Sequence, residues 1–315
     1  MKLITVVTPC YNEEDNVEEI YAQTKNVFSS IEAVSYEHLF IDNCSTDRTQ
    51  ELLRKLAATD PKVKVILNAR NFGHIRSPYH GLMQAEGDAA IQLAADLQDP
   101  PELIKQFVAH WLAGEKIVVG VKPSSEESSI MFGVRRLYYR MVTRIADVKL
   151  IQNFTGFGLY DRQVLNVLRQ IDDPYPYLRG LISEVGFGAT QISYGQPKRM
   201  RGITKNNFYT LYDIAMLGIT SHSRVPLRIA TMLGFTLSGL SLLMSLVYLI
   251  FKLIFWDQFS LGIAPVLIGV FFFASVQLFF IGLLGEYVGA ILTQVMKRPL
   301  VVERERINFK DPASG

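Results

Sequence analysis

Two long apolar runs in the C-terminal part of the chain limit what it can fold into. They cover Ile229 to Phe251 and Leu261 to Gly285, and neither contains a formally charged residue. A helix needs about 20 apolar residues to cross the hydrocarbon core of a bilayer, which is about 30 Å thick. The alternative is a pair of core helices in a soluble protein, but helices that exceed about 20 residues usually carry a polar stripe. We therefore predict two transmembrane helices.

The charges beside these runs predict their orientation. Arg224 and Arg228 precede the first run, and the second is followed by Lys297, Arg298, Arg304 and Arg306. Basic flanks favour the cytoplasmic side of a membrane. The chain begins with an apolar strand and lacks the pattern of a secretory signal. We expect the large N-terminal domain and both termini to be cytoplasmic.

Composition excludes two kinds of function. Cys10 and Cys44 are the only cysteines and have no CxxC spacing, so we expect two thiols in a reducing cytoplasm rather than a metal site. The chain has 32 Lys and Arg against 30 Asp and Glu. This near-neutral balance argues against nucleic acid as the main partner.

Short apolar strands alternate with helical stretches before residue 223. Strands are expected near 3–7, 38–41, 63–67, 89–93 and 117–120, and helices near 14–28, 48–58, 78–85 and 102–113. This alternation predicts an α/β domain with a mostly parallel, Rossmann-like sheet and helices on its faces. Ligands of such sheets bind beyond the carboxyl ends of the strands, and polar clusters follow those ends here.

Residues 206–223 predict an amphipathic helix, because apolar residues recur there at spacings of three and four. Such a helix lies in the membrane interface or packs on the soluble domain, and the pattern fits both. The segment after it, 224–296, holds the two apolar runs. The remaining segment, 297–315, is expected to be a cytoplasmic tail, and its charged part after Val302 is expected to be mobile.

The first two strands end in the polar clusters Thr8-Pro9-Cys10-Tyr11-Asn12-Glu13-Glu14 and Asp42-Asn43-Cys44-Ser45-Thr46-Asp47. Taken singly, Asn12 and Ser45 are explained equally well as helix caps.

Five motifs in order resemble the family 2 glycosyltransferases with the GT-A fold. Besides the two clusters, they are Asn68-Ala69-Arg70-Asn71-Phe72-Gly73, Asp96-Leu97-Gln98-Asp99-Pro100-Pro101-Glu102 and Arg201-Gly202-Ile203-Thr204-Lys205. The resemblance implies a catalytic domain over 1–205. With two spans behind it, the chain is similar to the polyprenyl-phosphate branch, which includes bactoprenol glucosyltransferases and dolichol-phosphate mannose synthase.

The resemblance implies a site for a nucleotide-sugar donor. Pro9, Tyr11 and Glu13 would shape the site for base and ribose, and Asp42 would accept a hydrogen bond from the nucleotide. An aromatic face suits a pyrimidine, and a carboxylate suits a base or ribose donor. Arg70 would approach the diphosphate, although a surface ion pair explains it equally well.

The resemblance also implies a divalent metal, Mg²⁺ or Mn²⁺. The family pattern has two aspartates one residue apart, and Ala94 stands at the first position here. Asp96 and Gln98 would supply two oxygen ligands, with phosphate and water supplying the rest. Asp99 fits a turn and helix cap better than a metal ligand.

The acceptor phosphate requires cations, and we predict that Arg136, Arg140, Arg201 and Lys205 supply them. Attraction to anionic lipid head groups is the alternative for this group. Asp161 is the only carboxylate within 153–162, the segment that forms the sugar and acceptor side in relatives. It is a catalytic candidate beside Asp96 and Arg201, and a helix cap explains it equally well.

These expectations combine into one function: inverting transfer of glucose from a UDP-sugar to polyprenyl (undecaprenyl) phosphate at the bacterial inner membrane. A phosphate acceptor has a second pKa near 6, so it needs no strong general base. The alternatives are a polysaccharide synthase of the same family and a catalytically idle scaffold that binds nucleotide sugar. Small residues in the first run, Gly234, Ser238 and Ser241, would support a homo-oligomer.

Overall fold

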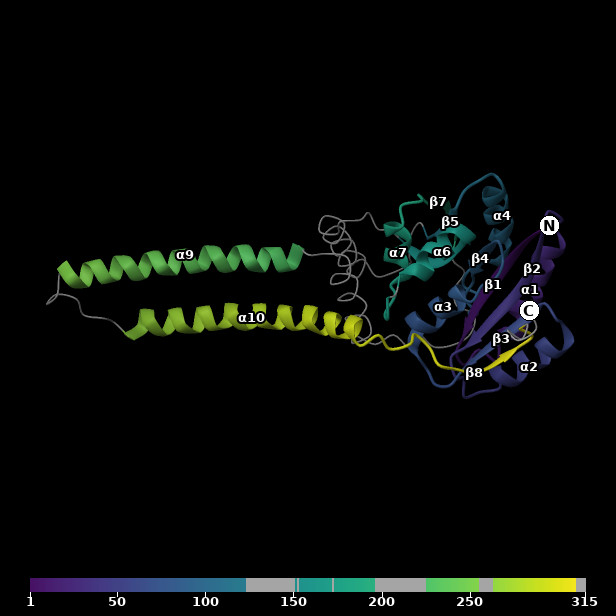
Figure 1. Ribbon diagram of the computed structural model, residues 1–315, viewed down its shortest axis with the longest axis horizontal. Helices are drawn as coiled ribbons and strands as arrows, with labels where there is room; N and C mark the ends of the chain where they lie inside the picture. Colours follow the sequence, from purple (N-terminus) through teal and green to yellow (C-terminus); the bar gives the residue numbers. More distant parts are fainter. Residues whose placement is uncertain (123–150, 152, 172, 196–224, 255–262, 310–315) are drawn as a thin grey trace. The chain divides into compact units, whose positions relative to one another are not determined.

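The computed structural model describes residues 1–122, 151, 153–171, 173–195, 225–254 and 263–309 (Figure 1). The chain divides into two compact units. The first comprises Met1–Tyr139, Val148–Asn207 and Met296–Gly315, and the second comprises Arg140–Asp147 and Phe208–Val295.

An eight-stranded sheet forms the centre of the first unit, in the order β7-β5-β6-β4-β1-β2-β3-β8. Its strands are β1 (Lys2–Cys10), β2 (Val34–Asp42), β3 (Val63–Asn68), β4 (Ala89–Gln92), β5 (Ile117–Val121), β6 (Phe154–Asp161), β7 (Thr190–Ser193) and β8 (Glu303–Ile307). The pairs β1–β2, β1–β4, β2–β3 and β5–β7 are parallel, whereas β6 and β8 run antiparallel to their neighbours. The predicted α/β fold with a mostly parallel sheet is confirmed.

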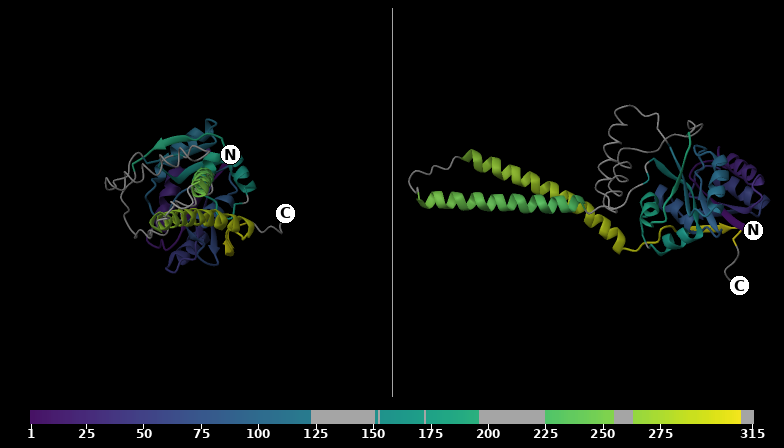
Figure 2. Two further views of the ribbon diagram at one scale, coloured as in Figure 1. Left: turned by 90° about the vertical axis from the view of Figure 1, so that its left-hand side faces the viewer. Right: turned by 90° about the horizontal axis from the view of Figure 1, so that it is seen from above.

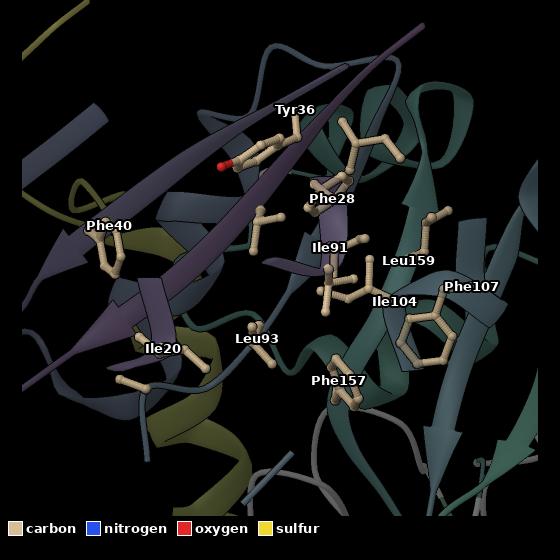
Figure 3. Packing of buried hydrophobic residues seen from close by; sticks show 14 of the residues in the cluster. Ile20, Phe28, Tyr36, Phe40, Ile91, Leu93, Ile104, Phe107, Phe157 and Leu159 are labelled. Carbon is tan, nitrogen blue, oxygen red and sulfur yellow. The ribbon is translucent and has the colours of Figure 1, made fainter. Parts of the chain in front are cut away.

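Helices cover both faces of this sheet. They are α1 (Val17–Ser29), α2 (Thr49–Thr59), α3 (Gly73–Met83), the 3₁₀ turn η1 (Pro101–Leu103), α4 (Ile104–Leu112), α6 (Arg162–Gln170) and α7 (Leu178–Glu184). Successive strand residues point to opposite faces, so Val6 joins the core under α1, α2 and α4, and Val7 joins the core under α3, α6 and α7. Figure 3 shows the first core, where the rings of Phe107 and Phe157 lie 4.8 Å apart. Both faces are therefore closed by apolar packing, which leaves the strand ends for polar residues.

Helix α3 begins at Gly73, earlier than the predicted start at Pro78. Pro78 is a typical first-turn residue, but here it lies inside the helix. Asn71 accepts a hydrogen bond from the Gly73 amide at 2.8 Å, and Asn43 donates to the Gly73 carbonyl at 3.3 Å. These side-chain contacts from neighbouring loops fix the start of the helix.

The expectation of a mobile C-terminal tail is wrong for residues 303–307, which form β8 on the outer edge of β3 (Figure 1). The Ala69 amide donates to the Val302 carbonyl at 2.9 Å just before this strand. Arg54 forms a bidentate ion pair with Glu305, with N–O distances of 2.5 and 2.6 Å. An edge strand exposes unpaired backbone groups, and β8 pairs those of β3. The prediction failed because the charged side chains of this segment find partners on the domain: Glu303 contacts His80, Arg304 contacts Gln50, Glu305 contacts Arg54 and Arg306 contacts Gln84.

The second unit contains two long helices, α9 (Val225–Ile254) and α10 (Ile263–Val295), which run in opposite directions and are inclined to each other (Figure 2). Their apolar side chains are exposed, with Phe235 at 75% and Phe279 at 69%. Within the described residues, Phe272–Val295 is long and apolar enough to cross a membrane by length and composition alone, and Ile229–Ser241 is a shorter apolar stretch. The two helices exist, and their function as two spans stays a prediction.

Candidate functional site

The carboxyl ends of four parallel strands meet at one edge of the sheet. Cys10 at the end of β1 is opposite Asp42 at the end of β2, and Asp42 is opposite Leu67 near the end of β3. On the other side of β1, Val7 is opposite Gln92, where β4 ends. The polar clusters that follow these strands therefore lie along one edge, as predicted.

Hydrogen bonds join the loop after β1 to the loop after β2. The Asn12 amide donates to the Ser45 hydroxyl at 2.9 Å, and the Thr46 amide donates to the Asn12 side-chain oxygen at 2.8 Å. Asn12 has a positive φ of 56°, a conformation that asparagine adopts more readily than most residues. Residues 16 and 48, not 12 and 45, occupy the cap positions of α1 and α2. The cap explanation for Asn12 and Ser45 is wrong, because both connect loops.

The residues predicted for base and ribose lie in this joined region. Pro9, Tyr11 and Glu13 are all half-buried. The Glu13 carboxylate accepts a hydrogen bond from the Asn16 side chain at 2.6 Å, so it is oriented at the start of α1. Their role in binding a nucleotide stays a prediction.

Asp42 is fully buried at the end of β2. It accepts hydrogen bonds from the Ser45 amide at 3.0 Å, from the Ser45 hydroxyl, and from the Gln50 side chain at 2.8 Å. Burial raises the pKa of Asp42, and the hydrogen bonds from Ser45 and Gln50 offset part of that rise. Asp42 thus anchors the β2–α2 loop, and its predicted contact with a nucleotide stays a prediction.

Sequence reasoning missed Gln50, the second residue of α2. The sequence offers one indication of its role: Gln50 is a polar residue in the first turn of the helix that follows the acidic strand end at Asp42. Sequence reasoning also missed Asn43. Its side-chain oxygen accepts a hydrogen bond from the Phe72 backbone N–H at 2.9 Å, and its side-chain nitrogen donates to the Asn71 side-chain oxygen at 2.8 Å. Asn43 therefore fixes the loop after β3, which carries Arg70.

Arg70 is exposed in that loop. Its guanidinium lies 4.0 Å from the centroid of the Phe72 ring and donates to the Asn71 carbonyl at 3.1 Å. Among the residues that the structure describes, no salt bridge of Arg70 is present, so the ion-pair explanation gains no support. Its contact with the ring orients a cation at the edge where the strands end.

A tight turn after β4 carries the predicted metal ligands. Leu97 has a positive φ of 56°, and the Gln98 amide donates to Asp96 at 3.3 Å. The described part of the chain contains no cluster of three or more His, Cys, Asp or Glu that would hold a metal unaided. Asp96 and Gln98 nevertheless offer hard oxygens, and Mg²⁺ or Mn²⁺ is commonly held by one or two protein groups together with substrate phosphates. The donor set fits a metal that binds with a diphosphate.

Asp99 does not cap the helical turn after it, because Pro100 occupies the cap position of η1. Its carboxylate is buried and accepts a hydrogen bond from the Tyr194 hydroxyl, across the sheet on the residue after β7. Burial raises the pKa of Asp99, and the bond from Tyr194 offsets part of the rise. Asp99 therefore fixes the turn that holds Asp96.

Asp161 lies at the other end of β4. It is opposite Ala89, the first residue of β4, because β6 runs antiparallel. It is the N-cap of α6, accepting from the Gln163 amide at 2.9 Å, and it also accepts from the Trp111 indole at 2.8 Å. β4 alone spans about 10 Å, so Asp161 is well separated from the turn at Asp96. The structure shows the helix cap that was the alternative to catalysis.

Gly156 lies where β6 begins, near the end of β4. Its φ is 109°, and a Cβ atom there would lie 3.1 Å from the Gln92 side-chain nitrogen. Glycine thus keeps room for Gln92 at the edge of the site. The remaining predicted residues, Arg136, Arg140, Arg201 and Lys205, and the predicted amphipathic helix over 206–223, lie outside the described residues.

Comparison with known proteins adds family information to this geometry. The model of Glycosyl transferase family 2 matches residues 5–169. The chain is 33% identical over 308 residues to the uncharacterized glycosyltransferase YkcC of Bacillus subtilis, covering 98% of this chain and 95% of that protein. It is 32% identical over 297 residues to the SfII prophage-derived bactoprenol glucosyl transferase of Shigella flexneri, covering 94% and 96%. Among solved structures, glucosyl-3-phosphoglycerate synthase from Mycobacterium tuberculosis matches 70% of this chain and 78% of its own, with 17% identity and a TM-score of 0.48.

Proposed function

The chain belongs to glycosyl transferase family 2 and is a glycosyltransferase, and we propose that it transfers a sugar from a nucleotide diphosphate to a polyprenyl phosphate. One observation carries this proposal. The loop with Tyr11, the anchored carboxylate of Asp42 and the turn with Asp96 follow adjacent parallel strands and lie at one edge of the sheet. Relatives called bactoprenol glucosyl transferases align with nearly the whole chain, which supports a lipid phosphate as acceptor and glucose as the sugar.

The donor in this proposal is UDP-glucose. The half-buried Tyr11 offers an aromatic face to the uracil, with Pro9 and Glu13 beside it. Asp42 holds the loop against which the nucleotide rests. Arg70 approaches the diphosphate, where a planar guanidinium pairs well with phosphate oxygens.

Asp96 and Gln98 would hold Mg²⁺ or Mn²⁺ together with the donor diphosphate. When bound, the ion supplies positive charge that stabilises the leaving diphosphate. The Gln98 backbone N–H donates a hydrogen bond to the Asp96 carboxylate, and Leu97 between them has a left-handed backbone conformation. Together they fix the carboxylate just after the end of β4. The hydrogen bond from the Tyr194 hydroxyl to Asp99 stabilises that turn.

The reaction is a single displacement at the anomeric carbon. An oxygen of the acceptor phosphate forms the new bond to carbon while the bond from carbon to the donor's β-phosphate oxygen breaks, and UDP leaves with the electron pair. The configuration of the sugar carbon inverts. Because the acceptor is already largely ionised at neutral pH, no protein base has to remove a proton. In this proposal Arg136, Arg140, Arg201 and Lys205 bind the acceptor phosphate, and no catalytic role is assigned to Asp161.

We further propose that α9 and α10 anchor the enzyme in the bacterial plasma membrane as two spans. Their exposed apolar side chains, among them Phe235 and Phe279, support this assignment. The catalytic domain and both termini then lie on the cytoplasmic side, where nucleotide sugars are available. Small residues along α9 would permit packing of a second copy.

The test uses the full chain in detergent with labelled UDP-glucose, undecaprenyl phosphate and either Mn²⁺ or a chelator. We expect labelled lipid in the presence of metal and none with the chelator. Nucleotide binding without transfer under any metal condition would favour the scaffold alternative. Label in a polymer that forms without added lipid phosphate would favour the polysaccharide synthase. A parallel screen of other UDP- and GDP-sugars identifies the donor.

A further inference from the structure

Gln50 connects the C-terminal strand β8 to the buried carboxylate of Asp42. The Arg304 guanidinium on β8 donates to the Gln50 side-chain oxygen at 2.5 Å. The Gln50 side-chain nitrogen donates to Asp42 at 2.8 Å and to the Ser45 carbonyl at 3.0 Å. A continuous hydrogen-bonded path therefore leads from the last strand of the chain to the loop after β2.

The path continues from Ser45 to the loop after β1. The Ser45 hydroxyl, which donates to Asp42, accepts a hydrogen bond from the Asn12 amide at 2.9 Å. Asn12 directly follows Tyr11, the residue proposed to face the nucleotide base. Arg304 is thus linked through three side chains to both loops of the proposed donor site.

The chemistry of its neighbours fixes which way the Gln50 amide points. An arginine offers only donors, so it requires the amide oxygen. The Asp42 oxygen that Gln50 contacts also accepts from the Ser45 backbone amide, and the Ser45 carbonyl is an acceptor, so both require the nitrogen of the Gln50 side chain. A rotation of the amide by half a turn would oppose both sets of contacts. Arg304 therefore holds the donor end of Gln50 toward Asp42.

Strand β8 is held in place without Arg304. Glu305 pairs with Arg54 on α2, and Glu303 contacts His80 on α3 at 2.6 Å. The Asn308 side chain donates to the carbonyls of Ala57 and Val63 at 2.7 and 2.8 Å. Removing the Arg304 side chain should therefore leave the strand paired, which separates its effect on the loop from its effect on folding.

We propose that Gln50 and Arg304 are positioning residues for donor binding, so that the strand after the last apolar helix completes the nucleotide site. This proposal rests on the proposed function, since it takes the loops at Tyr11 and Asp42 as the donor site. Neither residue has to touch the sugar or the metal. Both act by holding the Asp42 carboxylate and the loop that it anchors.

The first variant is Arg304→Ala in the full chain. The Michaelis constant for the nucleotide sugar should rise about fivefold, as expected for one lost hydrogen bond, while kcat stays within about twofold. The dissociation constant for UDP alone, measured by calorimetry, should rise by about the same factor. The Michaelis constant for polyprenyl phosphate should not change.

Arg306→Ala is the matched control. Arg306 is on the same strand, is also exposed, and contacts Glu303 and Gln84 rather than Gln50. It removes the same charge from the same edge, so any general effect of charge or of strand pairing appears in both variants. Only Arg304→Ala should weaken nucleotide binding.

Gln50→Glu tests the direction of the path. Glutamate keeps an acceptor for Arg304 but turns a second acceptor toward Asp42 and the Ser45 carbonyl. We expect UDP binding to weaken by about tenfold or more, beyond the effect of Arg304→Ala. Gln50→Leu, which removes both ends of the contact, should fall between the two.

Two kinds of failure are distinguishable. If the unaltered chain binds no UDP and transfers no sugar, the proposed function fails first. If the unaltered chain is active and Arg304→Ala binds UDP as tightly as Arg306→Ala, the positioning role is refuted. Equal loss in both arginine variants, together with a lower melting temperature, would also refute it, since the strand would then act through stability alone.

Discussion

Replacing Asp161 by alanine removes three contacts at once. The carboxylate caps α6 through the Gln163 amide, accepts the Trp111 indole N–H, and lies 3.4 Å from the Lys116 ammonium. Trp111 is buried, so its N–H would have no other partner in the described structure unless water entered. The substitution therefore tests whether Asp161 stabilises the domain or takes part in catalysis.

The expected loss of stability follows from these contacts. An N-cap contributes about 1 kcal/mol. A buried indole N–H left without a partner costs about 1–3 kcal/mol. The Lys116 side chain is 37% exposed, so that ion pair adds less than about 1 kcal/mol. We expect Asp161→Ala to lower the free energy of unfolding of the catalytic domain by about 2–5 kcal/mol.

The assay is chemical denaturation of the full chain in detergent, followed by tryptophan fluorescence, with kcat measured on the folded protein at low temperature. Asp161→Asn is the control, because asparagine is a good N-cap but has one acceptor oxygen for two donors. It should lose about half as much stability as alanine. Both variants should keep kcat within about threefold, since the residue lies at the edge opposite Asp96.

The pH dependence gives a second readout. Burial acts to raise the pKa of Asp161, but the hydrogen bonds from Trp111 and Gln163 and the charge of Lys116 outweigh it, so the pKa lies below its usual value. The stabilisation is therefore present above about pH 4, the unfolded pKa, and is lost as the pH falls through the folded pKa. The stability gap to Asp161→Ala should shrink over that range. A large drop in kcat for Asp161→Asn at unchanged stability would refute this account and restore the catalytic assignment.

Three further predictions concern other parts of the molecule. Asp96→Asn should lower the rate of sugar transfer by roughly a hundredfold or more at saturating Mn²⁺, because a charged metal ligand is lost. The melting temperature should not change. Unaltered turnover would mean that the metal is bound elsewhere. Arg201→Ala should raise the Michaelis constant for lipid phosphate about tenfold and that for the donor little, and equal effects on both substrates would contradict a role in acceptor binding. Gly81→Val should lower the free energy of unfolding by about 1–3 kcal/mol in chemical denaturation. A Cβ atom at this position would lie 2.8 Å from Ile41 Cγ2 and 3.0 Å from Val7 Cγ1. Unchanged stability would mean that α3 can move away from the sheet without cost.

Local patterns predicted most of the catalytic domain. The strands at β1 to β5 and the helices α1, α2 and α4 follow from alternating apolar runs, and the polar clusters after β1, β2 and β4 follow from strand ends. Strand β8 could not be predicted in this way, because its partner β3 lies more than two hundred residues earlier in the chain. Its charged sequence is typical of a solvated tail, and it becomes a strand through backbone pairing with β3, with Glu305 paired to Arg54 on α2.

The contacts within the site were harder to predict than its position. Asn12 and Ser45 have the composition of helix caps, and only the three-dimensional meeting of two loops shows that they bond to each other. Gln50 was missed for the same reason, since its two ends contact residues from different parts of the chain. Sequence identifies which residues follow a strand, whereas hydrogen-bond partners across loops depend on strand order.

Asp42 and Asp161 show why strand direction decides the role of an acidic residue at a strand end. Each is the last residue of its strand and is followed by a helix. β2 runs parallel to β1, so Asp42 lies at the edge where the other parallel strands end. β6 runs antiparallel to β4, so Asp161 lies at the edge where β4 begins. Burial dominates at Asp42 and raises its pKa, whereas hydrogen bonds and Lys116 lower the pKa of Asp161. In this sheet, a carboxylate that ends or follows a strand is therefore a candidate for ligand binding when that strand runs parallel to β1, as β2 and β4 do and β6 does not.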